Sequence, residues 1–253
     1  MVRFRSELAE AALTPELLLR AYAAGIFPMS TGRHADTIVW LSPEHRAVFP
    51  LDKLRVPHRL ARTIRSDRFR VTVNSAFHEV IRQCAAPAPG REETWINEDI
   101  ERVYMELHDT GHAHSVESWW NGELVGGLYG LQLGAAFFGE SMFSAARDAS
   151  KVALAHLMAR LICGKFMLLD AQFMTVHLAQ FGAVELARND YLRHLRDAIA
   201  KHADFYCPDP SGSSGSFSLA CASGDTGLTG AMDATVGACW PGWLVLQLIT
   251  QTS

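Results

Sequence analysis

The sequence lacks any long hydrophobic run. No stretch of its 253 residues approaches 18 consecutive apolar residues, which is about the length that a membrane-spanning helix needs. The first seven residues include two arginines and a glutamate and contain no apolar segment of the kind found in secretory signal peptides. These two absences predict a protein that is not exported, has no membrane partner and is cytoplasmic.

Cysteine is scarce and has no paired spacing. The five cysteines are an odd number, and none of them form a C-x-x-C motif; they are Cys84, Cys163, Cys207, Cys221 and Cys239. A disulfide framework and a structural zinc site both rely on regular cysteine spacing. We therefore predict a chain without either, in a reducing compartment.

Metal-binding and serine-hydrolase motifs are incomplete. His112 and His114 could share one face of a strand, but no third ligand follows at a suitable spacing. The tripeptide 139–141 begins like a nucleophile elbow, yet Phe143 stands where the G-x-S-x-G pattern requires glycine. We therefore predict no metal, no cofactor and no serine-hydrolase mechanism.

Basic residues are sparse overall but concentrate in one segment. The formal net charge is -4, which by itself does not indicate a nucleic-acid partner. Between residues 44 and 70, however, eight Lys or Arg residues stand against three Asp or Glu residues. A helix predicted over residues 57–66 turns Leu60 and Ile64 inward and leaves Arg59, Arg62 and Arg65 outward. This segregation fits a phosphate-binding face, with an Arg-rich surface that meets only solvent as the alternative.

The hydrophobic fraction of 49% is ample for a core, and its patterning predicts an α+β (mixed α/β) fold. Residues 38–41, 70–74, 114–120, 123–129 and 135–139 are predicted strands, with a hairpin turn at Asn121-Gly122. Helices are predicted from Pro15 to Ala24, over 76–84 and from about residue 97. Residues 26–29 are predicted as a loop, and 244–249 as an edge strand or a frayed tail. We expect a small N-terminal domain over 1–56 and a larger one over 57–253, with a Ser/Gly-rich segment at 211–230.

The stretch from residue 137 to 172 combines apolar side chains with carboxylates. It contains a predicted helix with an apolar face, which Ser144 or Asp148 can cap and Gly164 can end. A predicted buried strand follows, in which Asp170 and Gln172 share a face, roughly 6 to 7 Å apart. Glu140 adds a second carboxylate to an otherwise apolar wall. This combination suits a site that holds an apolar group beside a cation, although a strand end that meets solvent is the alternative for the Asp170 and Gln172 pair.

At these residues the sequence resembles the leucyl/phenylalanyl-tRNA-protein transferases. The matching motifs are, in chain order, Gly25-Ile26-Phe27-Pro28, Trp40-Leu41-Ser42-Pro43, Arg46-Ala47-Val48, Thr94-Trp95-Ile96, Gly111-His112-Ala113-His114-Ser115, Leu124-Val125-Gly126-Gly127, residues 137–144, Ala149-Ser150-Lys151 and Asp170-Ala171-Gln172. The resemblance implies an acyl-CoA N-acetyltransferase-like core in the larger domain. It also implies transfer of Leu or Phe from leucyl-tRNA or phenylalanyl-tRNA to acceptor proteins with N-terminal Arg or Lys, which marks them for N-degron proteolysis. A purely apolar pocket should accept Met as well. We expect a monomer.

The resemblance also assigns site residues. Seven positions match family residues that line the pocket for the leucyl or phenylalanyl side chain, namely Leu128, Phe137, Gly139, Met142, Leu157, Leu161 and Leu169. Trp95 matches a tryptophan near the terminal adenosine of the tRNA, and Met29 stands where other members carry a second tryptophan. The family's proposed proton relay matches Asp170 and Gln172. We expect instead that Asp170 fixes Gln172, that Gln172 orients the attacking amine, and that Glu140 attracts a cationic amine.

Two other function classes compete with this hypothesis. A CoA-dependent N-acetyltransferase would need a glycine-rich turn for the pyrophosphate, and no glycine lies between Glu140 and Lys151. A non-catalytic tRNA-binding module would need the arginines of residues 57–66 but not the set of Glu140, Asp170 and Gln172.

Overall fold

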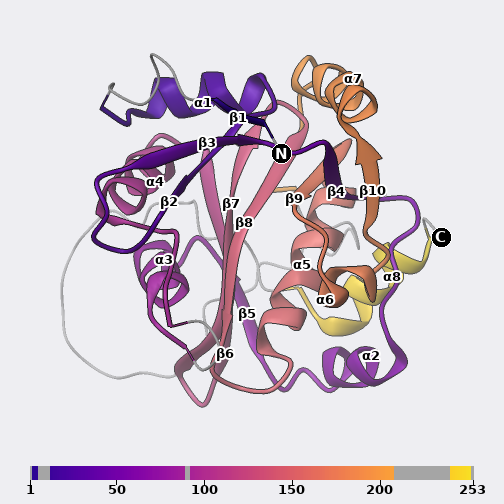
Figure 1. Ribbon diagram of the computed structural model, residues 1–253. Helices are drawn as coiled ribbons and strands as arrows, with labels where there is room; N and C mark the ends of the chain where they lie inside the picture. Colours follow the sequence, from indigo (N-terminus) through magenta and orange to yellow (C-terminus); the bar gives the residue numbers. More distant parts are fainter. Residues whose placement is uncertain (1, 5–11, 89–91, 208–239, 252–253) are drawn as a thin grey trace.

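The computed structural model of the chain describes residues 2–4, 12–88, 92–207 and 240–251, and arranges them around two β-sheets (Figure 1). The Ser/Gly-rich segment 211–230, Cys221 and Cys239 lie outside the described residues. Helices cover both faces of the larger sheet, as the prediction of a mixed α/β fold requires. The likeness to acetyltransferases stays a prediction.

The larger sheet has seven strands and one parallel pair. Its spatial order is β10 (Val184–Ala187), β4 (His45–Phe49), β9 (Leu168–Gln172), β8 (Ala136–Ser144), β7 (Glu123–Leu133), β6 (Ala113–Trp120) and β5 (Arg70–Val73). Every neighbouring pair is antiparallel except β8 with β9. The predicted hairpin between β6 and β7 is confirmed, because Asn121 (φ 53) and Gly122 (φ 83) both have the positive φ of a type I′ turn.

Two hydrophobic cores lie on the two faces of this sheet. On one face, α5 (Ala149–Cys163) packs with α2 (His58–Arg65) and α8 (Gly242–Gln251). The other face is covered by α1 (Pro15–Ala23), α3 (Phe77–Ala85), α4 (Glu98–Asp109) and α7 (Arg188–Ile199). Helix α5 is buried on almost all sides, since the sheet lies on one side of it and α8 and α2 on the other. Among the described residues, no helix is long and apolar enough to cross a membrane.

The smaller sheet has three strands in the order β1 (Val2–Phe4), β3 (Ile38–Ser42) and β2 (Phe27–Ser30). The prediction of a loop over residues 26–29 was wrong for residues 27–29, because they pair with β3, which lies about ten residues further along the chain and cannot be recognised as a partner from the local pattern. Strand β4 also lies before residue 56, yet it belongs to the larger sheet, so residues 1–56 contribute strands to both sheets. The division into domains at residue 56 stays a prediction.

Helix boundaries follow the capping signals in the sequence. Thr14 Oγ1 accepts from Leu17 N (3.2 Å) and Asn97 Oδ1 accepts from Ile100 N (3.0 Å), so α1 and α4 begin where predicted. At α5, Ser144 Oγ accepts from Ser150 N (3.3 Å), whereas Asp148 makes no capping bond. The predicted edge strand at 244–249 was wrong: these residues lie in α8, whose apolar side chains pack on α2 and α5.

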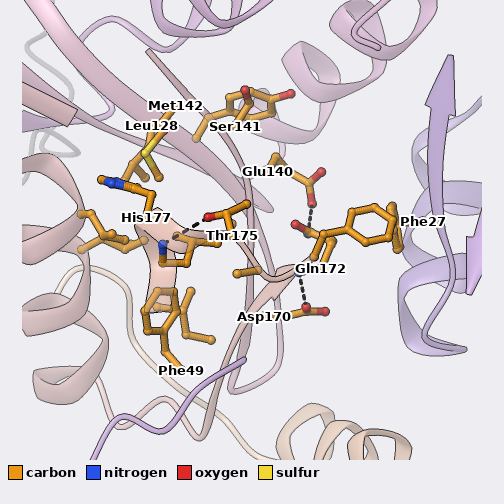
Figure 2. A pocket seen from close by; sticks show the side chains of 18 of the residues that line it. Phe27, Phe49, Leu128, Glu140, Ser141, Met142, Asp170, Gln172, Thr175 and His177 are labelled. Atoms are coloured by element: carbon orange, nitrogen blue, oxygen red, sulfur yellow. Dashed lines mark hydrogen bonds between the residues drawn. The ribbon is translucent and has the colours of Figure 1, made fainter. Parts of the chain in front are cut away.

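The parallel pair β8 and β9 separates soon after it forms, and this gap positions the site (Figure 2). The two strands pair only over Ala136–Phe138 and Leu168–Asp170. Beyond that point each strand has a bulge against its other neighbour: Glu140 is the extra residue in β8, and Ala171 is the extra residue in β9. Because of the bulges and of φ 56 at Gln172, side chains there do not alternate strictly between the two faces of the sheet, as regular strands would require.

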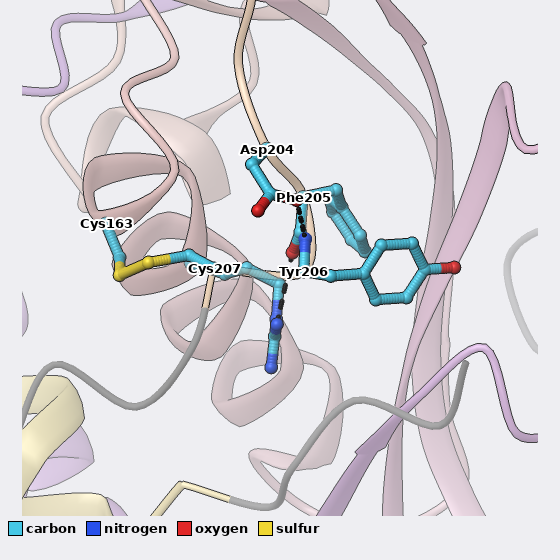
Figure 3. Close-up of a disulfide and its surroundings, with 6 residues drawn as sticks. Cys163, Asp204, Phe205, Tyr206 and Cys207 are labelled. Atoms are coloured by element: carbon cyan, nitrogen blue, oxygen red, sulfur yellow. Dashed lines mark hydrogen bonds between the residues drawn. A yellow bond between two sulfur atoms is a disulfide. The ribbon is translucent and has the colours of Figure 1, made fainter. Parts of the chain in front are cut away.

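A disulfide joins Cys163, the last residue of α5, to Cys207 (Figure 3). The prediction of a chain without disulfides was wrong, because the fold brings together two cysteines 44 residues apart. Asp204 N donates to Gly164 O (3.0 Å), which folds the segment after α7 back onto the end of α5. Phe205 in this segment stacks on Phe137, with 5.6 Å between the ring centroids.

The disulfide should stabilise the chain measurably. Closing a loop of 44 residues removes unfolded-state entropy, so we expect reduction, or Cys207→Ser, to lower the free energy of unfolding by about 2–4 kcal/mol. Denaturant unfolding with and without dithiothreitol measures this. The Cys207→Ser protein is the control, since its stability should not respond to the reductant. An equal response in both proteins would contradict the assignment.

Candidate functional site

A cavity of about 380 Å³ lies where β8 and β9 separate. Figure 2 shows polar groups in its middle, Glu140, Gln172 and Asp170, with Leu128 and Met142 on one side of them and Phe27 on the other. Its lining comes from both hydrophobic cores: Phe49, Leu128, Met142, Leu154, Leu157, Leu169, Ala171 and Leu178 from one, and Phe27, Met29, Trp95 and Tyr129 from the other. The cavity therefore passes from one face of the sheet toward the other.

Most of the predicted site residues meet in this cavity. Seven of the nine predicted substrate-binding residues line it, namely Met29, Trp95, Leu128, Gly139, Met142, Leu157 and Leu169, and so do Glu140, Asp170 and Gln172. Phe137 and Leu161 do not line it; both lie in the core, where Phe137 packs on Phe166 and Phe205. The predicted tRNA-binding residues Arg59, Arg62 and Arg65 are exposed on α2, outside the lining. What each residue binds stays a prediction.

Glu140 sits on the bulge of β8 among uncharged donors. Its Oε1 accepts from Tyr22 Oη at 2.7 Å and from Gln172 Nε2 at 3.2 Å, and Tyr22 Oη lies 2.7 Å from Tyr104 Oη. Burial raises the pKa of Glu140 from 4.5 to about 8, although the hydrogen bond from Tyr22 lowers it. Glu140 can therefore exchange a proton near neutral pH.

Asp170 has a cation as its partner instead. Arg46 from β4 donates to it from Nε (2.9 Å to Oδ1) and Nη2 (2.8 Å to Oδ2), and Tyr191 Oη donates to Oδ2 at 2.7 Å. The backbone N–H of Gln172 donates to Oδ1 at 2.8 Å. Arg46 is only 1% exposed, so its inclusion among the basic residues of a phosphate-binding face was wrong.

His114 of the 111–115 motif makes contacts within the core. His114 stacks on Phe205, with 4.0 Å between the centroids, and its Nδ1 lies 3.0 Å from Asn74 Nδ2. Burial lowers the pKa of His114 to about 3, so the ring is neutral. Across the described residues, no group of three or more His, Cys, Asp or Glu side chains is arranged to hold a metal ion.

The turn between β8 and α5 is poorly suited to a pyrophosphate. Asp148 occupies the N-cap position of α5 with φ 69, and its Oδ1 lies 3.4 Å from Lys151 Nζ. A carboxylate at a helix N-terminus competes with a bound phosphate for the same backbone donors and the same positive field. The local chemistry therefore gives the CoA-dependent alternative no support.

Several side chains of the site were not predicted from the sequence. Phe27 and Arg46 lie within quoted motifs, so the resemblance marked their segments but not their roles. Tyr22, Tyr104 and Tyr191 come from the buried faces of three helices, where local pattern predicts only core packing. Thr175, the N-cap of the short helix α6 (Val176–Ala179), and Leu178 within that helix carry no recognisable sequence signal.

Comparison with known proteins gives a consistent match. The sequence model described as "Leucyl/phenylalanyl-tRNA protein transferase" matches residues 48–196, and the model of its N-terminal domain matches residues 11–44. A leucyl/phenylalanyl-tRNA--protein transferase of Nitrobacter winogradskyi is 58% identical over 199 residues, which is 79% of this chain and 88% of that protein. Proteins of the same name from Phenylobacterium zucineum and Rhodopseudomonas palustris (strain BisB18) are 53% and 56% identical, over 93% and 87% of this chain and 96% of each relative.

The raised pKa of Glu140 predicts a pH-dependent effect of Glu140→Gln on stability. The unfolded carboxyl ionises near pH 4.5, whereas the folded one keeps its proton until about pH 8, so the wild type loses stability as pH rises between these values. Glutamine does not ionise, so the variant's advantage in Tm should grow from pH 5 to pH 8 and then level off. Thermal melts across this range test it against Glu123→Gln, an exposed control. A difference that stays constant with pH would refute the assignment.

Proposed function

The chain belongs to the leucyl/phenylalanyl-tRNA-protein transferase family, and from that premise we propose that it moves a leucyl or phenylalanyl group from aminoacyl-tRNA to the N-terminal amine of a protein. The acceptors that we propose are proteins with N-terminal Arg or Lys, and the transfer would mark them for N-degron proteolysis. We also propose that the enzyme acts as a cytoplasmic monomer.

The contact between Gln172 and Glu140 carries this proposal. This contact crosses the gap between β8 and β9, where lining residues from one hydrophobic core meet those from the other. The apolar part takes the leucyl or phenylalanyl side chain, since burial of a charged or polar side chain among Phe49, Leu154 and Leu157 would be costly. Trp95 and Met29 take the terminal adenosine, and the ester then lies beside Glu140 and Gln172.

The chemistry is aminolysis of an activated ester. The acceptor nitrogen attacks the carbonyl carbon, a C–N bond forms, and the bond from that carbon to the ribose oxygen breaks. One proton leaves the amine and one proton reaches the ribose oxygen, so the reaction is balanced without an added reactant. An α-amine has a pKa of about 8, so a useful fraction is already neutral, and positioning supplies most of the rate.

Gln172 and Glu140 have different roles in this scheme. A carboxamide is too weak a base to remove a proton, so Gln172 orients the amine by accepting from it through Oε1. In its ionised form Glu140 attracts an ammonium group, and its pKa of about 8 lies close to that of the amine it meets. A proton can therefore pass from the ammonium to Glu140 at little free-energy cost.

The direct test is a transfer assay with Gln172→Glu as the diagnostic variant. The wild type should attach labelled leucine to a peptide that begins with Arg, and not to a matched peptide with an acetylated N-terminus. If Gln172 orients the amine, Gln172→Glu should lower the rate by about 10²-fold, because it removes the donor to Glu140 and adds a second carboxylate. A retained or raised rate would instead support a base at position 172.

Controls separate the alternatives. Acetyl-CoA should neither protect the protein in a thermal-shift assay nor acetylate the peptide. Tight binding of leucyl-tRNA without any transfer would overturn the proposal in favour of a non-catalytic tRNA-binding module.

The exposed arginines of α2 should contribute to tRNA binding. Reversing the charge of Arg59, Arg62 and Arg65 together should weaken tRNA binding and reduce the slope of log K against log salt by about 0.7–0.9 for each phosphate that these arginines neutralise in the wild type. Arg193, Arg196 and Lys201 are an exposed control set of equal charge. Binding that is unchanged, or weakened equally by both sets, would remove α2 from the interface.

A further inference from the structure

Arg46 is a buried cation at the edge of the proposed site. It lies on β4, the strand next to β9, and its side chain is 1% exposed. Three of its contacts go to one carboxylate: Nε lies 2.9 Å from Oδ1 and 3.0 Å from Oδ2 of Asp170, and Nη2 lies 2.8 Å from Oδ2. Such a fork-to-carboxylate contact fixes orientation as well as charge.

The guanidinium also contacts two aromatic rings and a backbone carbonyl. Its Cζ lies 4.4 Å from the ring centroid of Phe27 and 4.8 Å from that of Tyr191, and Nη1 donates to Gly25 O at 3.3 Å. Arg46 thus joins β4 to β2, to α7 and to the turn after α1. Since Phe27 also lines the cavity, the same group supports part of the cavity wall.

The carboxylate that Arg46 holds sets the backbone of Gln172. Asp170 Oδ1 accepts from Gln172 N at 2.8 Å, and Gln172 has φ 56, a left-handed conformation that is uncommon for residues other than glycine. From that conformation Gln172 Nε2 reaches Glu140 Oε1 at 3.2 Å. A continuous series of contacts therefore runs from Arg46 through Asp170 and Gln172 to Glu140.

We propose that Arg46 is a positioning residue for the transfer reaction: by fixing the carboxylate of Asp170 from the neighbouring strand β4, it holds Gln172 in the conformation that orients the attacking amine. This inference rests on the proposed function. Burial opposes the charge of Arg46, but the negative charge of Asp170 raises its pKa above the ordinary value, so the cation persists. A lysine keeps the charge but cannot reproduce the fork or the planar contact with aromatic rings.

The test compares Arg46→Lys and Arg46→Met with Arg160→Lys. Arg160 is a matched control, because it is also buried and also contacts aromatic rings, those of Phe205 and Trp240, and does not line the cavity. We expect the single-turnover transfer rate to fall about tenfold in Arg46→Lys and about 10²-fold in Arg46→Met, with the Kd for leucyl-tRNA within about threefold of wild type. Arg160→Lys should lower Tm without lowering this rate.

A second measurement does not depend on activity. The backbone N–H signal of Gln172 in ¹⁵N–¹H spectra should shift in Arg46→Lys and stay in place in Arg160→Lys, since only the first change alters the acceptor of that N–H group. If Arg46→Met does not fold, Arg46→Lys decides by both measurements.

The outcomes separate the two proposals. A wild type that transfers nothing overturns the proposed function, and the Gln172 signal then still tests whether Arg46 sets its conformation. A wild type that transfers leucine, with Arg46→Lys equal to Arg160→Lys in rate and in the Gln172 signal, overturns the role of Arg46 alone.

Discussion

The site depends on the early separation of one parallel strand pair. Strands β8 and β9 pair over only three residues each, and then both turn aside at a bulge. A continuous sheet would leave no passage between the two hydrophobic cores. The gap creates one, and its walls are apolar because the interior of each core reaches it directly. Backbone groups that lack a strand partner at the gap form other hydrogen bonds, such as that from Gln172 N to Asp170 Oδ1.

The bulges explain how polar groups reach an apolar cavity. Glu140 is the extra residue of β8, so it is displaced from the regular pleat toward Tyr22. On β9 the extra residue is Ala171, and the left-handed Gln172 that follows turns its amide toward Glu140. Two irregularities in neighbouring strands therefore produce one contact across the gap. This agrees with the general placement of bulges beside functional sites.

Local pattern in the sequence was sufficient for elements whose signals are local. Thr14, Asn97 and the Asn121-Gly122 turn each act on neighbouring residues, and the structure has the expected caps and hairpin. It failed where partners are distant: β2 exists because it pairs with β3, and the Cys163–Cys207 bond because the chain returns to the end of α5. The consecutive apolar residues of α8 fit the period of a strand as well as that of a helix, and packing on α5 favours the helix. The resemblance located the segments of the site, but not the tyrosines from α1, α4 and α7 that complete it.

The two carboxylates of the site lie in contrasting environments, and this contrast bears on how the site would handle an amine. Asp170 faces a guanidinium and two further donors, so its charge is matched inside the protein. Glu140 faces hydroxyl and amide donors only, and burial raises its pKa to about 8. Burial therefore disfavours the charge of Glu140, and an entering cation would stabilise it. In the proposed reaction an ammonium group supplies that cation, and the burial that raises the pKa of Glu140 favours transfer of a proton to it, which leaves the neutral amine that aminolysis requires.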